Sequence, residues 1–436
     1  MSNESLDTVM GALVCLEKYM PNINISNFRR WDYVKITILG FATTALWQSL
    51  HSIILPQRIL DFVPEAQKNT YLGILTLCGL LLAMFAQPIA GAISDVSRFK
   101  WGRRRPYIFW GMIISLLLLP GFAWAGSFAA IFAVYCLLQV SANTAQGPYQ
   151  AFLPEMVPEQ KRGMASGFRS LFELAGGVSF VLIAGKVYTD KTGIEGLWIL
   201  LGSLGFVLLV TILTTVLLVH EKPGIAVKQN ASPLAAFKDI VKSDTWKNRS
   251  FVWFLISRLL FYMGFTTIQQ FAFYYVQDVV GVDDPAATAA LFVAIAAGGM
   301  LIVVWPAGYF SDKVGRKLMT AIAGVIGASG IVLIALTNSY GAILIAAGVI
   351  GVSKGIFDST NWALATDFAS KNREAIYLGI ANVATTGGAA LARLVGPGID
   401  YFNLQSPLSG YNFMLIMCII YFVAGGVMVW GVKKRV

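Results

Sequence analysis

The sequence contains few charged residues. Only 13% of its 436 residues are Asp, Glu, Lys or Arg, whereas a soluble domain carries about 25%. Apolar residues make up 56% of the chain, a share that is unsuited to a soluble core and normal for a protein that crosses a membrane many times. The composition therefore argues against a soluble enzyme or binding domain.

Histidine and cysteine are also scarce, which argues against metal and disulfide chemistry. The two histidines, His51 and His220, are far apart, and the chain has no HExxH sequence, so no metal site is expected. The four cysteines form no CxxC pair, and we expect them to be free thiols. A membrane enzyme and a non-transporting membrane sensor remain alternatives from another functional class, and the sequence favours neither.

Long apolar stretches dominate what is present. Each is long enough to cross about 30 Å of hydrocarbon as a helix. They fall near 33–56, 70–94, 106–127, 128–152, 163–187, 196–219, 251–277, 286–309, 318–336, 339–364, 375–399 and 411–431. We therefore predict an all-α membrane protein with twelve transmembrane helices.

The net charge of +10 follows a topological pattern. With the amino terminus placed inside, the cytoplasmic segments hold 25 of the 33 Lys and Arg residues, and the external loops hold four. This asymmetry is the positive-inside rule, and it predicts that both termini are cytoplasmic. The basic balance thus indicates a bilayer as partner and no nucleic acid. The first 30 residues show no cleavable signal peptide, and we expect a multi-pass protein of the cell membrane (the inner membrane if bacterial).

A basic loop occurs twice. Residues 91–106 are GAISDVSRFKWGRRRP and residues 308–317 are GYFSDKVGRK, with Asp95 and Asp312 lying 217 positions apart. A second pair of similar segments, 153–167 and 365–379, follows in the same order. Internal repeats of this kind are typical of transporters. We predict a cytoplasmic segment 1–32, six-helix bundles at 33–219 and 251–431, a cytoplasmic linker at 220–250 and a tail at 432–436.

This arrangement resembles the major facilitator superfamily. The resemblance is carried by the twelve spans, the central loop and the G-x-x-S-D loops that precede Gly-Arg pairs after spans two and eight. Within that superfamily, the first loop, with Asp95 ahead of GRRRPY, is similar to the branch of sucrose/proton symporters and glycoside–pentoside–hexuronide:cation symporters. The resemblance implies two pseudo-symmetric six-helix bundles that rock around a central cavity.

The repeated loops are predicted to form a gate at the inner edge of the membrane. Carboxylates there can accept hydrogen bonds from Arg and from helix N-termini in one conformation and release them in the other. The alternative is a polybasic patch that only holds anionic lipid and sets topology. The candidate gate residues are Asp95, Arg103, Arg104, Arg105, Glu155 and Arg162 in the first half, and Asp312, Arg316, Asp367 and Arg373 in the second.

Charged side chains inside the spans are candidates for proton coupling, because charge within a bilayer is costly. Arg169 and Glu173, like Lys354 and Asp358, are four residues apart and so share a helical face. Glu173 or Asp358 could carry the proton. Alternatively, each pair is a neutralised structural ion pair.

Polar faces on spans one, four, seven, ten and eleven predict a substrate cavity. Amides and charged groups can hydrogen-bond sugar hydroxyls, and aromatic rings can stack on pyranose rings; interhelical hydrogen bonding is the alternative. The candidate substrate-binding residues are Gln48, His51, Asn143, Gln146, Gln150, Arg258, Tyr262, Gln269, Asn361, Trp362, Asn382 and Arg393.

The expected activity is proton-coupled uptake of a neutral sugar or glycoside such as sucrose or maltose, by a monomer without cofactors. The resemblance implies that a sodium site would use carboxylates on span two, which has none; uniport stays open. Apart from Lys35 and Lys186 near the span ends, the spans contain four basic and two acidic residues. An anionic sugar, held by Arg258 or Arg393 as a bidentate clamp, is therefore the alternative substrate.

Overall fold

The computed structural model describes residues 28–189, 192–219, 221, 248–337, 339–368 and 374–432. Residues 1–27, most of the predicted linker and residues 433–436 lie outside this part. The described chain is helical throughout and contains no strand, which confirms the all-α prediction.

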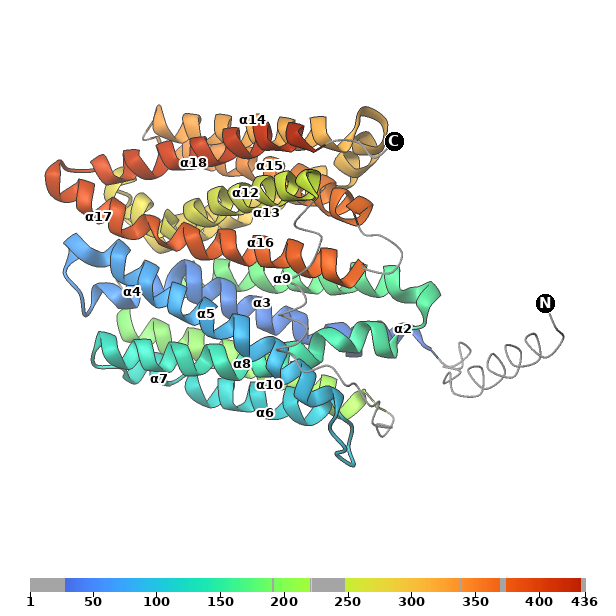
Figure 1. Cartoon of the computed structure of the whole chain (residues 1–436). Helices are drawn as coiled ribbons and strands as arrows, with labels where there is room; N and C mark the ends of the chain where they lie inside the picture. The colour runs from blue at the N-terminus through green and yellow to red at the C-terminus, as the bar shows by residue number, and fades with distance from the viewer. Residues whose placement is uncertain are drawn as a thin grey trace.

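The helices divide into two sets on either side of residues 222–247. The first set comprises α2 (Arg30–Thr37), α3 (Leu39–Ser49), η2 (Leu50–Ile54), α4 (Leu55–Leu60), η3 (Glu65–Gln67), α5 (Lys68–Asp95), α6 (Arg105–Leu118), α7 (Gly121–Trp124), α8 (Phe128–Met156), η4 (Glu159–Lys161), α9 (Arg162–Val187) and α10 (Gly193–Leu218). The second set comprises α12 (Arg249–Tyr275), η6 (Val276–Val280), α13 (Pro285–Val314), α14 (Arg316–Ala335), α15 (Tyr340–Phe368), α16 (Glu374–Arg393), α17 (Val395–Gln405), α18 (Ser409–Met428) and η7 (Val429–Gly431). In Figure 1 the first set, blue to green, forms one layer, and the second set, yellow to red, forms the other.

These elements combine into twelve helical stretches that are long and apolar enough to span a membrane, as the sequence predicts. Most extend beyond the apolar runs; the first covers Arg30–Leu60 where 33–56 is predicted, because a helix does not need apolar residues to continue into the interface. Large apolar side chains face outward along them, including Trp305, which is 82% exposed. Such a surface would be unfavourable in water, whereas in a bilayer these apolar side chains contact the acyl chains of the lipids.

The first helix of each set contains a π-helical turn near one end. Leu50–Ile54 forms η2 between α3 and α4, and Val276–Val280 forms η6 at the end of α12. Gly281, with φ +65°, ends η6 in the left-handed conformation that favours glycine. Wide turns of this kind are rare and often occur at functional sites. The two turns lie 226 positions apart, at different places along their spans.

We name the end of the molecule that carries the loop 96–104 and Gly315 the loop face, and the opposite end, with residues 61–67 and 406–408, the far face. The two sets of helices pack closely toward the far face. A methyl group on Gly73 of α5 would lie 2.4 Å from the carbonyl oxygen of Arg393, and one on Gly396 of α17 would lie 2.3 Å from that of Asn69. Glycine is therefore required where these helices cross.

Candidate functional site

A hydrogen-bonded cluster on the first half surrounds Tyr135. The Tyr135 hydroxyl lies 2.9 Å from His51 Nε2 and accepts a 2.7 Å hydrogen bond from Gln139 Nε2. Asn143 donates in turn to Gln139 Oε1 at 3.1 Å. The indole ring of Trp47 stacks on His51, with ring centroids 5.5 Å apart. The predicted residues His51 and Asn143 therefore meet in one network, centred on a tyrosine that the sequence analysis did not single out.

The two halves touch through a pair of amides. Gln269 Nε2 of α12 donates to Gln48 Oε1 of α3 at 3.3 Å, and this bond is exposed. Gln146 is half-buried and Gln150 is exposed on α8, and neither bonds to another described residue. The predicted amides on α3 and α12 thus come together, while the outer two on α8 remain available.

An ion pair lies on the second half. Lys354 Nζ donates to Asp358 Oδ2 at 2.6 Å, and the Tyr262 hydroxyl donates to Asp358 Oδ1 at 3.2 Å. The Lys354 ammonium also lies 5.4 Å from the ring centre of Tyr262 and 5.3 Å from that of Phe265. Both charged side chains are half-buried, so the pair is partly accessible and has aromatic rings on one side.

Arg258 is buried and its donors are largely occupied. It donates to Asn361 Oδ1, to Thr385 Oγ1 at 2.8 Å and to the Ala381 carbonyl at 3.1 Å. Its guanidinium also lies over Trp362, 5.7 Å from the ring centre. These bonds connect α12, α15 and α16. Arg258 therefore joins three helices of the second half, and its donors are not free for the bidentate clamp that the sequence analysis considered.

Arg393 differs from Arg258 because it is incompletely bonded. Its side chain is buried, with one hydrogen bond to the Ala389 carbonyl, and its Nε has no partner in the described structure. The guanidinium is close enough to His51 and Tyr135 on the first half to interact with both electrostatically. Asn382, also on α16, is exposed. Arg393 is thus a buried cation beside the Tyr135 cluster.

A second ion pair lies on α9. Arg169 Nε donates to Glu173 Oε1 at 2.8 Å, and the guanidinium lies 5.6 Å from the ring centre of Tyr149. Tyr149 itself accepts from the Gly40 amide at 3.0 Å and donates to the Thr37 carbonyl at 2.9 Å. Tyr149 is therefore fixed in the helix packing and cannot serve as a ring on which a sugar stacks.

The first repeated loop forms an extensive network of charges. Arg104 pairs with Asp95 and Glu155, donates to Ser94 Oγ at 2.7 Å, and offers its backbone amide to Glu221 at 2.9 Å. Burial lowers the pKa of Arg104, but its bonds to Glu155 and Asp95 outweigh this, and the pKa is raised overall. Asp95 and the arginines are thus brought together as the sequence predicts.

The neighbours of Arg104 complete this network. Arg103 pairs with Glu155 at 2.9 Å, and Arg105 donates to the carbonyls of Trp101 and Val216. Arg162 does not reach Glu155; it donates to the Pro154 and Val157 carbonyls at 2.8 and 3.3 Å. Gly102, with φ +120°, has the Glu221 carboxylate where a side chain would otherwise lie.

The second repeated loop has a smaller network. Arg316 pairs with Asp367, lies 3.6 Å from Asp312, and donates to the Ala363 carbonyl at 2.6 Å. The Asp312 and Asp367 side chains are 72% and 54% exposed, so water competes for this loop more than for the first. Arg373 lies outside the described residues.

The far face contains a seal that the sequence analysis missed. Asp400 of α17 accepts from Asn69 Nδ2 at 2.8 Å and from the Thr70 amide at 2.7 Å, both at the start of α5. Lys68 pairs with Asp278 at 2.6 Å. The only hint in the sequence was that these polar residues lie next to apolar runs, which is also true of ordinary loop ends.

Further bonds join the described parts of the two halves. A bond from the Tyr274 hydroxyl to the Pro56 carbonyl at 2.8 Å adds to the seal at the far face, and the Gln48–Gln269 bond also crosses between the halves. The described halves are therefore held together at the far face by several hydrogen bonds and an ion pair.

Comparisons with known proteins agree with this architecture. The family model described as Major Facilitator Superfamily matches residues 36–393. The sucrose transport protein SUC4 of Arabidopsis thaliana is 31% identical over 128 residues, which cover 25% of this chain and 25% of that protein. The lactose permease of Leuconostoc lactis is 24% identical over 248 residues, 51% of this chain and 38% of the permease. The chain therefore matches well under half the length of these curated relatives.

Solved structures show the same fold. The crystal structure of the nucleoside transporter NupG (D323A mutant) has a TM-score of 0.73 at 16% identity, and covers 92% of this chain and 100% of that one. A bacterial homologue of the human lysosomal transporter Spinster, in an inward-facing and occupied conformation, has a TM-score of 0.70 at 14% identity, over 92% and 96% of the chains. With twelve membrane helices in two sets and a family model that spans most of its length, this chain belongs to the major facilitator superfamily and is a multi-pass membrane protein.

Proposed function

We propose that this transporter is a proton-coupled symporter that takes up a neutral sugar or glycoside, such as sucrose or maltose, by alternating access. In this proposal it works as a monomer in the cell membrane with both termini in the cytoplasm, and it needs no cofactor besides the proton. The sucrose and lactose transporters among its relatives support this substrate class.

The observation that carries the proposal is that the two halves contribute different polar groups, amides on the first half and an ion pair on the second. The first half contributes Gln139 and Asn143 beside Tyr135, and Gln48, which bonds Gln269, and amides both donate to and accept from hydroxyl groups. The second half contributes the Lys354–Asp358 pair. A sugar needs the first set, and proton coupling needs a titratable group such as the second.

In this proposal, the hydrogen bond from Tyr262 to Asp358 couples sugar binding to protonation of Asp358. Protonation of Asp358 would remove the partner of Lys354 and change what Tyr262 can donate to. With the ion pair intact, these two residues are neutral together, whereas protonation leaves the charge of Lys354 unbalanced. Because unbalanced charge in a bilayer is costly, the two protonation states favour different conformations, and substrate binding beside Tyr262 can select between them.

Uptake into proteoliposomes tests this function. An inward proton gradient should drive accumulation of a radiolabelled disaccharide above its external concentration, and a protonophore should abolish the accumulation. Equilibration without accumulation would indicate a uniporter. Failure to move any neutral glycoside, with or without the gradient, would reject the substrate class.

A second candidate, transport of an anionic sugar, is favoured by one observation. Arg393 is buried, and no carboxylate among the described residues pairs with it, so a hexuronide carboxylate would supply the missing charge. A thermal-shift panel of matched neutral and anionic sugars separates the candidates. Greater stabilisation by the anionic sugars, lost in Arg393→Gln, would replace the neutral substrate with an anionic one.

A further inference from the structure

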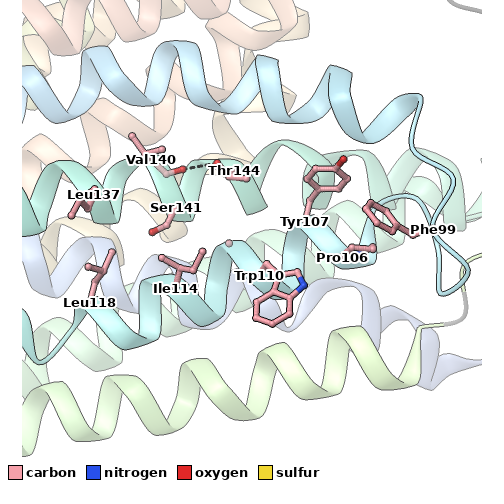
Figure 2. Close-up of a pocket in the computed structure, with 11 residues that line it drawn as sticks. Phe99, Pro106, Tyr107, Trp110, Ile114, Leu118, Leu137, Val140, Ser141 and Thr144 are labelled. Carbon is pink, nitrogen blue, oxygen red and sulfur yellow. Dashed lines mark hydrogen bonds between the residues drawn. The ribbon is translucent and has the colours of Figure 1, made fainter.

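An apolar groove lies on the outside of the first half, away from the polar residues between the halves. It has a volume of about 420 Å³ and lies between α6 and α8. Figure 2 shows Phe99, Pro106 and Tyr107 at its loop-face end and Leu118 and Leu137 at the other. Trp110, Ile114 and Leu137 on its walls are 58%, 47% and 57% exposed. In a membrane protein such a groove faces acyl chains rather than water.

The mouth of this groove has the features of a membrane interface. Phe99 and Tyr107 pack edge to face with ring centroids 6.1 Å apart, and the Tyr107 hydroxyl lies 2.6 Å from Ser97 Oγ. Aromatic side chains with one polar end prefer the headgroup region. The groove therefore runs from the level of the headgroups toward the middle of the membrane.

Two cations are adjacent in sequence to Phe99 at the mouth and are not used by the loop network. Arg98 and Lys100, on either side of Phe99, are exposed, and neither has a hydrogen bond or ion pair with another described residue. Arg103, Arg104 and Arg105 in the same loop all have such partners. The positive-inside rule alone would explain basic residues in this loop. It does not explain why these two, next to the open end of an apolar groove, have no partner among the described residues.

A groove on the second half lacks this mouth. It has a volume of about 570 Å³ and is lined only by Ile, Val and Gly of α13, α14 and α15. Lys313, in the last turn of α13, lies over the ring of Tyr309, 4.3 Å from its centre. Both halves thus have a groove, and the first combines it with aromatic rings and unpaired cations.

We propose that the groove between α6 and α8 is a binding site for one anionic phospholipid, with an acyl chain along Trp110 and Ile114 and the headgroup phosphate held by Arg98 and Lys100. Charge complementarity selects an anionic headgroup over a zwitterionic one, since basic side chains near an anionic lipid surface attract it. The site lies outside the substrate path and is independent of the transported sugar.

Native mass spectrometry of the full chain in detergent, with equal amounts of phosphatidylglycerol and phosphatidylcholine, tests the proposal. The wild type should retain phosphatidylglycerol preferentially. Arg98→Gln and Lys100→Gln should each lower that preference by about fivefold, while the matched change Lys313→Gln in the second half should leave it unchanged. Equal retention of the two lipids by the wild type, or an unchanged preference in the double variant, would overturn the anionic site.

Filling the groove separates the acyl chain from the headgroup. Ile114→Trp and Leu137→Trp, both on exposed positions that tolerate a larger side chain, should lower retention of both lipids, whereas Ile326→Trp in the second-half groove should not affect the preference for phosphatidylglycerol. Glycerol phosphate should fail to displace the bound lipid. If it does displace the lipid, or if both groove variants retain lipid normally, the cations bind a phosphate without the groove and the proposed lipid site is wrong.

Discussion

The fourth helices of the two halves, α8 and α15, have the same length and different chemistry. They begin at Phe128 and Tyr340 and end at Met156 and Phe368, so both ends are 212 positions apart. At this offset, Gln139 and Asn143 of the first half correspond to Gly351 and Gly355 of the second. The repeat has kept the helix and replaced the side chains on one face.

The replacements show how the halves divide the work. A methyl group on Gly351 would lie 2.0 Å from the Ala296 carbonyl oxygen, so α15 packs against α13 at the level where α8 carries amides. The ion pair Lys354–Asp358 occupies the places of Ala142 and Gln146. One half therefore offers hydrogen-bonding amides from this helix, and the other offers charge.

The fifth helices reverse this division. Arg169 and Glu173 on α9 correspond, at the same offset, to Ala381 and Thr385 on α16, which accept the hydrogen bonds of Arg258 instead. Each half thus contains an ion pair, but on different helices. The comparison teaches that a duplicated scaffold can move its charges between helices without changing where the helices lie.

The largest effect is expected from removing the charge of Asp358 in the second-half ion pair. Asp358→Asn should abolish accumulation of substrate against its gradient, while counterflow exchange continues, because the site can bind but can no longer exchange a proton. Glu173→Gln, the matched change in the first half, should retain accumulation, since its pair lies against the fixed Tyr149. Uphill uptake by Asp358→Asn and none by Glu173→Gln would reverse the two roles.

The two loop networks should differ in their contribution to stability. Arg104 is buried between Asp95 and Glu155, and Arg104→Gln should lower the free energy of unfolding by about 2–3 kcal/mol. Arg316→Gln should cost only about 0–1 kcal/mol, because its carboxylate partners are exposed. Thermal unfolding in detergent, followed by tryptophan fluorescence, measures both. Equal losses would mean that exposure does not distinguish the loops.

The far-face seal should control which conformation is populated. Asp400→Asn removes the charge that the Thr70 amide and Asn69 bond to, and it should shift the population away from the sealed state by about tenfold. Distances between spin labels at the far ends of α5 and α17 report this shift. The control is Asn403→Ala, because the side-chain oxygen of Asn403 accepts a hydrogen bond from the Gly410 amide within the second half. An unchanged distance distribution in Asp400→Asn would show that packing alone closes this face.

The smallest effect is expected from single hydroxyls. Tyr135→Phe should weaken substrate affinity by about fivefold, the value of one net hydrogen bond, and leave the accumulation ratio intact. Tyr262→Phe should instead change the pH dependence of uptake, because Tyr262 bonds Asp358. Initial rates of uptake across substrate concentration and pH distinguish the two. The division of labour is contradicted if both variants behave alike.

Much of the fold could be predicted because membrane insertion leaves a strong local signal. Twelve apolar runs and a repeated loop are visible without any knowledge of contacts, and the pairing of Asp95 with an arginine follows from their positions at adjacent helix ends. The i,i+4 pairs Arg169–Glu173 and Lys354–Asp358 were predictable for the same reason, since helix geometry alone places them on one face.

The rest depended on contacts between distant segments. Nothing local indicates that Tyr135 joins His51 to Gln139, that Arg258 is occupied by Asn361 and Thr385, or that Asp400 reaches the start of α5. These bonds depend on helix rotation and on the approach of the two halves. Sequence periodicity gives the polar face of a helix, but it does not say which neighbour that face meets.

The π-helical turns have a consequence for how the first span of each half tolerates change. A π turn holds one residue more than an α turn, and each residue of an α-helix turns the chain by about 100°. Deleting one residue from Leu50–Ile54 would therefore restore a regular helix and leave the parts on either side of the turn facing as they do now, whereas a deletion elsewhere in this span would rotate one part against the other by about 100°. Gln48 and Trp47 on one side, and Pro56 and Arg58 with their bonds to Tyr274 and Phe122 on the other, would keep their directions, so this span tolerates the loss of a residue at the π turn better than beside it.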